Sequence, residues 1–264
     1  MALVVYWGMA FVLPKGILKE VEKRLCSFLW KGTLSSGYPK VAWDLVCRPT
    51  DEGGLRLRNV HILNQVLMSK HLWDVIRGDR SSIWVECIYI TRLRDRTVWM
   101  VSETTGSWGW KKLLKLRSLL LPHIRFLVGD GMTFSLWRDP WHELGPVIHL
   151  FSRGPNLTRT DVAAPLASVI INGQWVWPVQ GYRRNFMEFL QILHSLPTIH
   201  GGVDRVEWKH NGGTFFTSSV YDHFRTLGLK VGWSSLLSGV FKIPRNSFIL
   251  WLAILGKLST LDKP

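Results

Sequence analysis

Residues 125–141 constrain the fold more than any other stretch, because apolar residues alternate on both sides of a Gly-Asp-Gly loop. Alternation with a period of two places the apolar side chains of an extended strand on one face. Gly129 and Gly131 can supply the positive φ that a tight connection needs. Pro140 ends the second run, because it has no N–H to donate to a ladder. The stretch therefore predicts a tight β-hairpin centred on residues 129–131.

Two further turns predict hairpins in the second half of the chain. Residues 168–177 contain Asn172-Gly173, a dipeptide preferred in two-residue hairpin turns. Residues 204–216 surround the turn Asn211-Gly212-Gly213 in the same manner.

Helical periodicity and helix boundaries account for much of the remaining chain. Pro14 suits the first turn of a helix and Gly32 suits its end. Asn59 is a good N-cap for a second helix that Gly78 closes. Similar spacing predicts helices over residues 82–90, 110–121, 183–196, 217–227 and 248–255. The expected fold class is α+β, helix-rich, with several short antiparallel β-hairpins.

The chain is strongly basic. Its 264 residues include 33 Lys and Arg against 19 Asp and Glu, a formal net charge of +14. A balance of this kind favours a polyanionic partner, of which nucleic acid is the usual one. The alternative is a set of solvated basic faces, or a fragment whose acidic partner domain is missing. The first 125 residues hold twenty of the basic and ten of the acidic residues, so we expect any electrostatic interface mainly there.

Two basic segments are candidate nucleic-acid contacts. Lys15, Lys19 and Lys23 are four residues apart on the first predicted helix, which aligns them in one row. The row is either a solvated face or a set of phosphate contacts. In residues 92–96 three arginines alternate, and in an extended segment alternation places them on one side.

Tryptophans interleave with basic residues directly after these arginines. Trp99, Trp108 and Trp110 are followed by the basic residues of 111–117. Single-stranded nucleic acid is bound by cations at its phosphates and by aromatic faces at its bases. The alternative interpretation places these tryptophans in the core, because each of them buries a large apolar area.

Cysteine usage and hydropathy indicate an intracellular protein, in the nucleus or the cytoplasm. Cys26, Cys47 and Cys87 are far apart and form no C-x-x-C pair, which is typical of reduced thiols. The apolar start of the chain is shorter than the roughly 20 residues that cross a bilayer, and it lacks the basic region of a signal peptide. Such a start is typical of a chain that continues a larger core, and we expect no membrane partner.

Catalytic patterns are scarce. Asp139, His142 and Glu143 lie close together in the sequence, but their spacing matches no standard set of metal ligands. We interpret them as turn carboxylates beside a surface histidine. The Gly-Asp-Gly loop lacks the frame of a phosphate-binding loop, and neither G-x-S-x-G nor H-E-x-x-H occurs. We expect no catalytic residues and no metal site.

Three segments together resemble the C-terminal part of the polyprotein of plant non-LTR retrotransposons of the long interspersed class. The first begins with ILKEVEKRLCSFLWKG at residues 17–32 and continues through KVAWDLVCRP and EGGLRLRNVHILNQVLMSKHLW. The second is VGDGMTFSLWRDPW at residues 128–141. The third covers residues 208–264 and includes GGTFFTSSVYDHFR, FKIPRNSFILWLAIL and GKLSTLDKP.

The resemblance implies a division of the chain into three parts. Residues 1–80 resemble the helical thumb or connector region of the polymerase. Residues 81–202 resemble the connecting region with its central hairpin. Residues 203–264 resemble the start of a reverse transcriptase zinc-binding domain, whose Cys and His ligands are expected beyond Pro264. The resemblance therefore implies no zinc and no other cofactor for this chain.

The polymerase's catalytic residues are expected to be missing as well. The family's pair of adjacent aspartates does not occur, and the nearest pattern is Asp51-Glu52. Without such carboxylates, no metal pair can hold the incoming nucleotide and activate the primer end. Proteins of the parent family are RNA-directed DNA polymerases, but we expect this chain not to be an enzyme.

The function expected from this resemblance is a non-catalytic one, holding RNA or DNA beside the polymerase domain of the parent polyprotein. The alternatives are a non-functional remnant of a decayed element, or a Trp-rich module that docks a protein. A hydrolase using Asp139 and Glu143 is a more distant alternative. The candidate phosphate contacts are Lys15, Lys19, Lys23, Arg92, Arg94, Arg96, Lys111, Lys112, Lys115 and Arg117.

Overall fold

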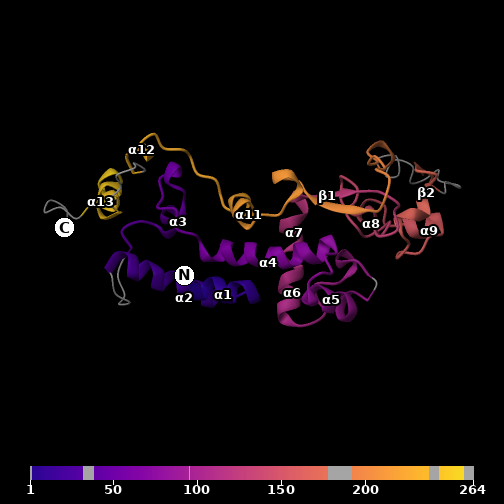
Figure 1. The fold of residues 1–264 in the computed structure, drawn as a ribbon, viewed down its shortest axis with the longest axis horizontal. Helices are drawn as coiled ribbons and strands as arrows, with labels where there is room; N and C mark the ends of the chain where they lie inside the picture. The colour runs from indigo at the N-terminus through magenta and orange to yellow at the C-terminus, as the bar shows by residue number, and fades with distance from the viewer. Residues whose placement is uncertain (1, 32–38, 95, 178–191, 238–243, 259–264) are drawn as a thin grey trace. The chain divides into compact units, whose positions relative to one another are not determined.

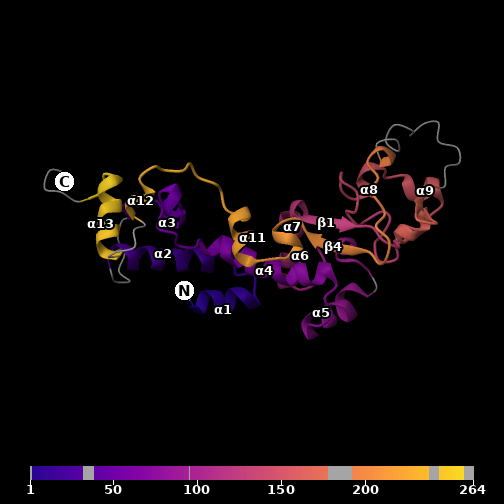
Figure 2. The ribbon, with the colours of Figure 1, turned by 45° about the horizontal axis from the view of Figure 1, so that its top comes forward.

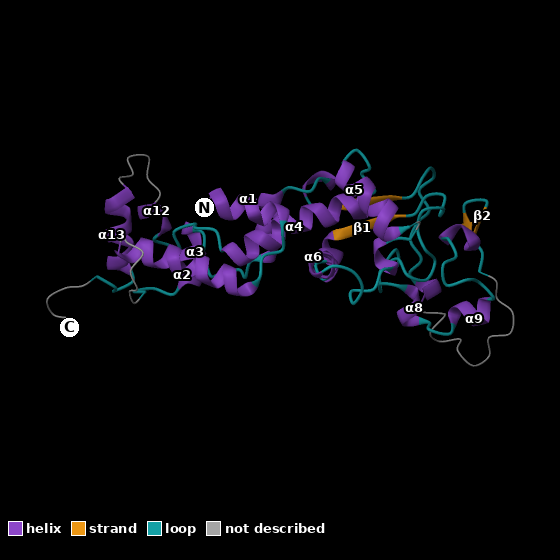
Figure 3. Cartoon of the chain, turned by 90° about the horizontal axis from the view of Figure 1, so that it is seen from below, coloured by secondary structure: helices purple, strands orange, loops and turns teal. Residues whose placement is uncertain are grey.

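The computed structural model describes residues 2–31, 39–94, 96–177, 192–237 and 244–258 (Figure 1). The chain forms two compact units, one of residues 1–67 with 220–264 and one of residues 68–219. We call them unit 1 and unit 2. Helices dominate and the strands are short (Figure 3), which confirms the expected α+β class. The sequence resemblance divides the chain into three parts by their likeness to family regions, whereas these two units are defined by compactness. The three-part division therefore stays a prediction.

Unit 1 is helical. Helices α4 (Val60–Arg77) and α11 (Thr217–Phe224) have residues in both units. The elements that lie wholly in unit 1 are α1 (Ala2–Ala10), α2 (Lys15–Lys31), α3 (Trp43–Cys47), the 3-10 turn η1 (Thr50–Glu52), α12 (Ser234–Leu237) and α13 (Pro244–Ile254).

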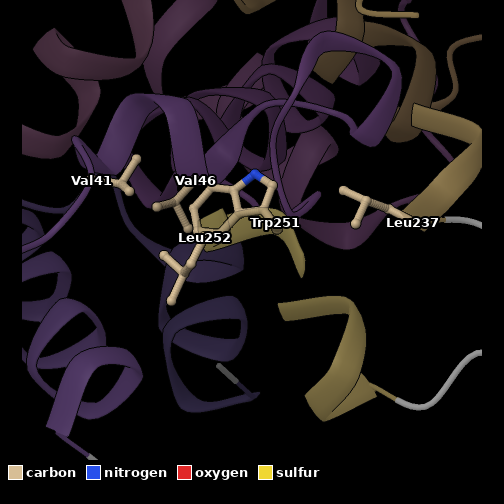
Figure 4. Packing of buried hydrophobic residues seen from close by; sticks show 5 residues of the cluster. All are labelled: Val41, Val46, Leu237, Trp251 and Leu252. Carbon is tan, nitrogen blue, oxygen red and sulfur yellow. The ribbon is translucent and has the colours of Figure 1, made fainter. Parts of the chain in front are cut away.

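The core of unit 1 joins the beginning and the end of the chain. Figure 4 shows Trp251 of α13 among Val41, Val46, Leu237 and Leu252, all of them buried. The indole Nε1 of Trp251 donates a hydrogen bond to the backbone carbonyl oxygen of Gly53, directly after η1, at 2.8 Å. Residues nearly two hundred positions apart therefore share one apolar core, whose burial stabilises by about 25 cal/mol for each Å² removed from water.

Local capping fixes the start of α4 as the sequence predicts. The Oδ1 atom of Asn59 accepts hydrogen bonds from the backbone N–H groups of His61 at 2.9 Å and Ile62 at 3.2 Å. These are two of the donors that have no partner within the first turn of a helix. Gly78 follows the last residue of α4 with φ 72°, as expected of a helix end.

Unit 2 combines short helices with two small sheets. Its helical elements are α5 (Ile83–Ile88), the π-helical turn η2 (Tyr89–Leu93), η3 (Val98–Met100), α6 (Trp108–Leu114), α7 (Arg117–Leu120), η4 (Leu121–His123), α8 (Val147–Leu150), α9 (Gly154–Thr158), η5 (Leu166–Val169) and η6 (Asn211–Gly213). Its strands are β1 (Ile124–Leu127), β2 (Ile170–Ile171), β3 (Gln174–Trp175) and β4 (Arg205–Trp208).

The predicted central hairpin is wrong. Strand β1 does not pair with the residues after the Gly-Asp-Gly loop but with β4, antiparallel, with Ile124 opposite Trp208 and Leu127 opposite Arg205. Figure 2 shows the two strands side by side. Residues 129–134 form bends instead of a strand. The first alternating run is a strand, but its partner lies about eighty residues further along the chain.

The Gly-Asp-Gly loop wraps a carboxylate. Asp204, directly before β4, accepts backbone hydrogen bonds from Gly129 at 2.8 Å and Gly131 at 3.0 Å on one oxygen. Its other oxygen accepts from Thr133 at 2.9 Å and Phe134 at 3.3 Å. We call this arrangement the Asp204 cradle. The alternating sequence predicts that residues after the loop pair as a strand. Instead, four backbone N–H groups of the loop and the residues after it donate to the Asp204 carboxylate.

The two glycines of the cradle are required by close backbone approach. A Cβ on Gly129 would stand 2.3 Å from the carbonyl oxygen of Gly202. Gly131 has φ +71°, and a Cβ there would stand 2.6 Å from the backbone nitrogen of Ala167. Both positions therefore need glycine for reasons other than a hairpin turn.

The other two predicted hairpins have different outcomes. The Asn172-Gly173 turn joins β2 to β3, which pair antiparallel with Ile171 opposite Gln174, so this hairpin is confirmed. The hairpin predicted over residues 204–216 is wrong. Its first strand is β4, but β4 pairs with β1, and η6 and residues 214–216 form no second strand. The helix predicted over residues 183–196 falls mostly outside the described residues.

Aromatic residues dominate the core of unit 2 beside β4. The Trp208 ring lies 5.5 Å from the Trp73 ring and 4.8 Å from the Phe215 ring, in edge-to-face geometry. Such pairs stabilise by about 0.5–1.5 kcal/mol beyond their buried area.

Across the described residues, no helix has the length and apolar character needed to cross a membrane.

Candidate nucleic-acid interface

The lysine row on α2 forms as predicted. Lys15, Lys19 and Lys23 are all exposed on this helix, and none of them has an ion-pair partner in the part of the chain that the structure describes. Glu20 is paired with Arg24 instead, at 3.1 Å. Three uncompensated ammonium groups along one helix face leave their donors available to phosphates.

The arginine segment of unit 2 differs from its prediction. Arg92 lies in the π-helical turn η2, and Arg94 follows with φ 47° and ψ 62°, a left-handed conformation. The extended geometry that would align residues 92, 94 and 96 is therefore wrong. All three side chains are exposed, but helical and left-handed backbone does not give them the common direction of an extended strand.

Helix α6 presents an exposed aromatic ring together with a cation. Trp108 is 52% exposed, whereas Trp110, two residues later, is 7% exposed and belongs to the core. The Nζ atom of Lys112 lies 5.6 Å from the centre of the Trp108 ring. The spacing of four residues brings the two side chains onto one helix face. We call this pair, with the half-buried Lys111 and the exposed Lys115, the α6 platform.

The α6 platform has an arginine close by. Gly106 lies in the loop before α6. If it carried a Cβ atom, that atom would stand 3.7 Å from Nη1 of Arg92. Of the predicted arginine segment, Arg92 is thus brought next to the loop that leads into the tryptophan-lysine segment.

Arg117 has a different role from the one predicted. Its Nη1 donates to the carbonyl oxygens of Val98 at 2.8 Å and Val101 at 2.9 Å. Its Nη2 pairs with Glu103 at 3.0 Å, and its side chain is 11% exposed. The guanidinium ties η3 to α7, so we leave Arg117 out of the proposed phosphate contacts.

The residues of the Asp139–Glu143 segment do not converge on one site. Asp139 is buried and accepts hydrogen bonds from the Thr97 hydroxyl and from the backbone N–H of Ser135. Burial raises the pKa of Asp139 to about 6, against the lowering effect of these two bonds. Glu143 is exposed. The histidine between them is buried, not on the surface as the sequence suggested.

The hydrogen bonds of His142 fix its role as structural. Its Nδ1 accepts from the backbone N–H of Leu144 at 3.2 Å, so Nε2 carries the proton in the neutral ring. Nε2 lies 3.1 Å from the carbonyl oxygen of Ile192 and 3.1 Å from the Ser195 hydroxyl. With Nδ1 accepting from Leu144, Nε2 is the donor of the neutral ring, so it does not act as a proton acceptor for the Ser195 hydroxyl.

Sequence reasoning missed two cations of unit 2 beside β1. Arg125 is exposed on β1 itself, and Lys209 is exposed directly after β4. Isolated basic residues in a strand gave no pattern to recognise. Their common location depends on the pairing of β1 with β4, which the predicted hairpin excluded.

Comparison with known proteins finds relatives in plants. The chain is 26% identical over 219 residues to an Arabidopsis thaliana protein provisionally named a ribonuclease H protein; the match covers 80% of this chain and 35% of that protein. It is 27% identical over 145 residues to an uncharacterized mitochondrial protein of Arabidopsis thaliana, covering 53% of this chain and 93% of that protein.

The chain thus spans about a third of the length of the first of these relatives. No protein-family profile matches the chain. No solved structure matches it either. Both relatives are plant proteins, which agrees with the plant origin implied by the sequence resemblance.

Proposed function

We propose that the chain is a nucleic-acid-binding part of a retrotransposon-derived plant protein, and that it contacts single-stranded RNA or DNA without cutting or copying it. The observation that carries this proposal is the α6 platform. There an exposed indole, a lysine over its face and further lysines provide the stacking surface and the cations that single strands require.

The lysine row of α2 and the relatives support the same proposal. Three exposed lysines without acidic partners provide sequence-independent phosphate contacts. The first relative is named for an activity on RNA. The reverse transcriptase connection rests on the sequence resemblance and remains part of the proposal.

The test is fluorescence anisotropy with short single-stranded RNA and DNA, titrated from low to physiological salt. We expect binding whose log K falls linearly with log salt. Trp108→Ala should weaken binding by about 1–3 kcal/mol, or roughly 5- to 150-fold, because one base loses its stacking partner. Trp84→Ala is the matched control, because Trp84 is also exposed, at 40%, and lies outside the platform.

Docking of a protein partner is the second candidate function. It is favoured by the apolar start of the chain, where Tyr6 and Trp7 of α1 and Phe11, directly after it, are all more than half exposed. This function predicts binding to protein that does not depend on salt, and no loss when Lys15, Lys19 and Lys23 are replaced by Gln. Absence of oligonucleotide binding by a folded chain at low salt would overturn the nucleic-acid proposal.

A further inference from the structure

A groove of about 770 Å³ runs along β1 in unit 2. All four residues of the strand contribute to its lining. The rest comes from residues 121–122, 140–145 and 196–198, from His200, and from Lys209 after β4. Its volume is typical of sites that hold a whole ligand, about 300–1,000 Å³. The groove is separate from the α6 platform, none of whose residues lines it.

Cations outnumber acids in the lining of this groove. Arg125 is exposed and has no ion-pair partner among the described residues, although it lies opposite Glu207 in the strand register. Lys209 donates one hydrogen bond from Nζ to the carbonyl oxygen of Pro122 at 2.8 Å, which holds the ammonium at the groove. An ammonium has three donors, so two remain. The one acidic residue in the lining is Glu143, and an exposed His200 lines the groove as well.

Apolar side chains form one wall of the groove, and hydrogen bonds and ring stacking hold it in place. Proline and leucine side chains make up much of it, including Leu144, Leu196 and Pro197. Trp141, also in the lining, is stacked on Trp175 with ring centres 5.3 Å apart and an interplanar angle of 18°. The backbone N–H of His200 donates to the carbonyl oxygen of Val128 at 2.8 Å, which fixes one wall to the end of β1.

We propose that this groove binds a short single-stranded segment of RNA or DNA, with Arg125 and Lys209 contacting phosphates and the apolar wall contacting base faces. The proposal rests on the proposed function and names a second site for it. Phosphates select cations, and bases present apolar faces of the kind that this wall can cover.

An extended peptide is the competing occupant. Among the described residues β1 has a strand neighbour on one edge only, and an open edge can accept an added strand. We favour nucleic acid because the excess of cations in the lining gives an electrostatic preference that a peptide of mixed charge does not satisfy. The test includes a peptide arm for this reason.

The experiment compares two double variants of the full chain that lose the same charge. Arg125→Gln with Lys209→Gln removes the groove cations, and Arg138→Gln with Arg153→Gln removes two exposed arginines that do not line the groove. Single-stranded oligonucleotides are titrated by anisotropy at several salt concentrations. We expect the groove variant to bind at least tenfold more weakly, and its salt slope to fall by about 1.4, since each phosphate contact on a single strand contributes about 0.7.

Each outcome decides between the proposals. Equal losses in both double variants would mean that total charge alone matters, which overturns the groove site and leaves nucleic-acid binding standing. No binding by the wild type would overturn the proposed function itself. If the groove variant loses binding of a mixed-charge peptide but binds oligonucleotides as the wild type does, the groove is assigned to protein.

Ultraviolet crosslinking of the wild-type chain to an oligonucleotide, followed by peptide mass spectrometry, provides a readout that does not depend on variant folding. Crosslinks within residues 121–127, 140–145 or 196–200 support the groove. Crosslinks confined to other segments overturn it.

Discussion

The two units hold buried carboxylates in different ways. Glu52 of unit 1 is 6% exposed and its carboxylate pairs with Arg225 at 2.8 Å, while the N–H of Gly228 donates a further bond at 2.8 Å. Asp139 of unit 2 is 1% exposed, and its hydrogen bonds come from a hydroxyl and an N–H. One carboxylate therefore has a half-buried guanidinium beside it, and the other has neutral donors.

The pKa values of these carboxylates shift in opposite directions. Burial alone would raise both, but at Glu52 the bonds and charge of Arg225, with the bond from Gly228, outweigh burial and lower the pKa below 4.5. At Asp139 burial dominates and the pKa rises to about 6, with nearby Asp204 adding to the rise. The comparison teaches that burial fixes the direction of a pKa shift only where no counter-charge is present. These two carboxylates should therefore contribute to stability in opposite ways as the pH falls.

The variant with the largest expected effect is Asp204→Ala, which removes the third buried carboxylate. It leaves four backbone N–H groups of the Asp204 cradle without their acceptor. Because hydrogen bonds to a charged group contribute about 1.5–3 kcal/mol each, we expect a loss of more than about 4 kcal/mol. Hydrogen exchange of the full chain should show lost protection in peptides covering residues 124–136 and 204–208, with unit 1 peptides unchanged.

The control for this variant lies inside the Gly-Asp-Gly motif. Asp130 is exposed and accepts one bond, from the backbone N–H of Met132 at 3.1 Å. Asp130→Ala should cost less than about 1 kcal/mol. Equal effects of the two variants would contradict the assignment of the motif to holding Asp204.

Glu52→Ala tests the paired carboxylate of unit 1. Removing one partner of a buried ion pair costs about 3–5 kcal/mol, and we expect the lower end because Arg225 keeps Asp222 at 3.0 Å. The folded pKa of Glu52 is lowered, so its contribution is present above pH 4.5 and is lost as pH falls. Urea unfolding curves of wild type and variant should therefore converge in acid. Asp222→Ala, at the exposed partner, should cost under about 1 kcal/mol.

Asp139→Asn tests the unpaired carboxylate of unit 2. The folded pKa of Asp139, about 6, lies above the ordinary 3.8, so its contribution to stability is present below pH 3.8 and is lost as pH rises through 6. The stability of wild type relative to the variant should fall by about 2 kcal/mol between pH 4 and pH 7, because the unfolded carboxyl is already partly ionised at pH 4. Urea unfolding at four pH values measures this difference. If the stability difference between wild type and Asp139→Asn stays constant or grows with pH, Glu52 and Asp139 do not respond oppositely to pH.

Three local signals in the sequence predicted their elements correctly. The Asn59 cap and the Asn172-Gly173 turn each depend on a few consecutive residues, and both form as expected. The lysine row of α2 likewise follows from helical spacing alone. These features need no information about the rest of the chain.

The failed strand pairing and the unpredicted contacts depend on partners far along the chain. Alternation around residues 129–131 indicates a strand but does not say which strand it pairs with, and Asp204 supplied the acceptor that turned the loop away from a hairpin. The pairing of Glu52 with Arg225 spans 173 residues and left no local pattern. The groove along β1 follows from the β1–β4 pairing, so it could not be predicted either.

Asn59→Ala has the smallest expected effect and isolates a neutral bond in unit 1. The variant removes the side-chain acceptor for the N–H groups of His61 and Ile62, while the backbone N–H of Asn59 can still donate to the Tyr221 hydroxyl. We expect a loss of about 1 kcal/mol in urea unfolding, equal at pH 4 and pH 7, because no proton is linked to this cap. Asn59→Asp keeps a capping oxygen and should lose less. If the stability lost in Asn59→Ala changes with pH, the acid response of unit 1 has a source other than Glu52.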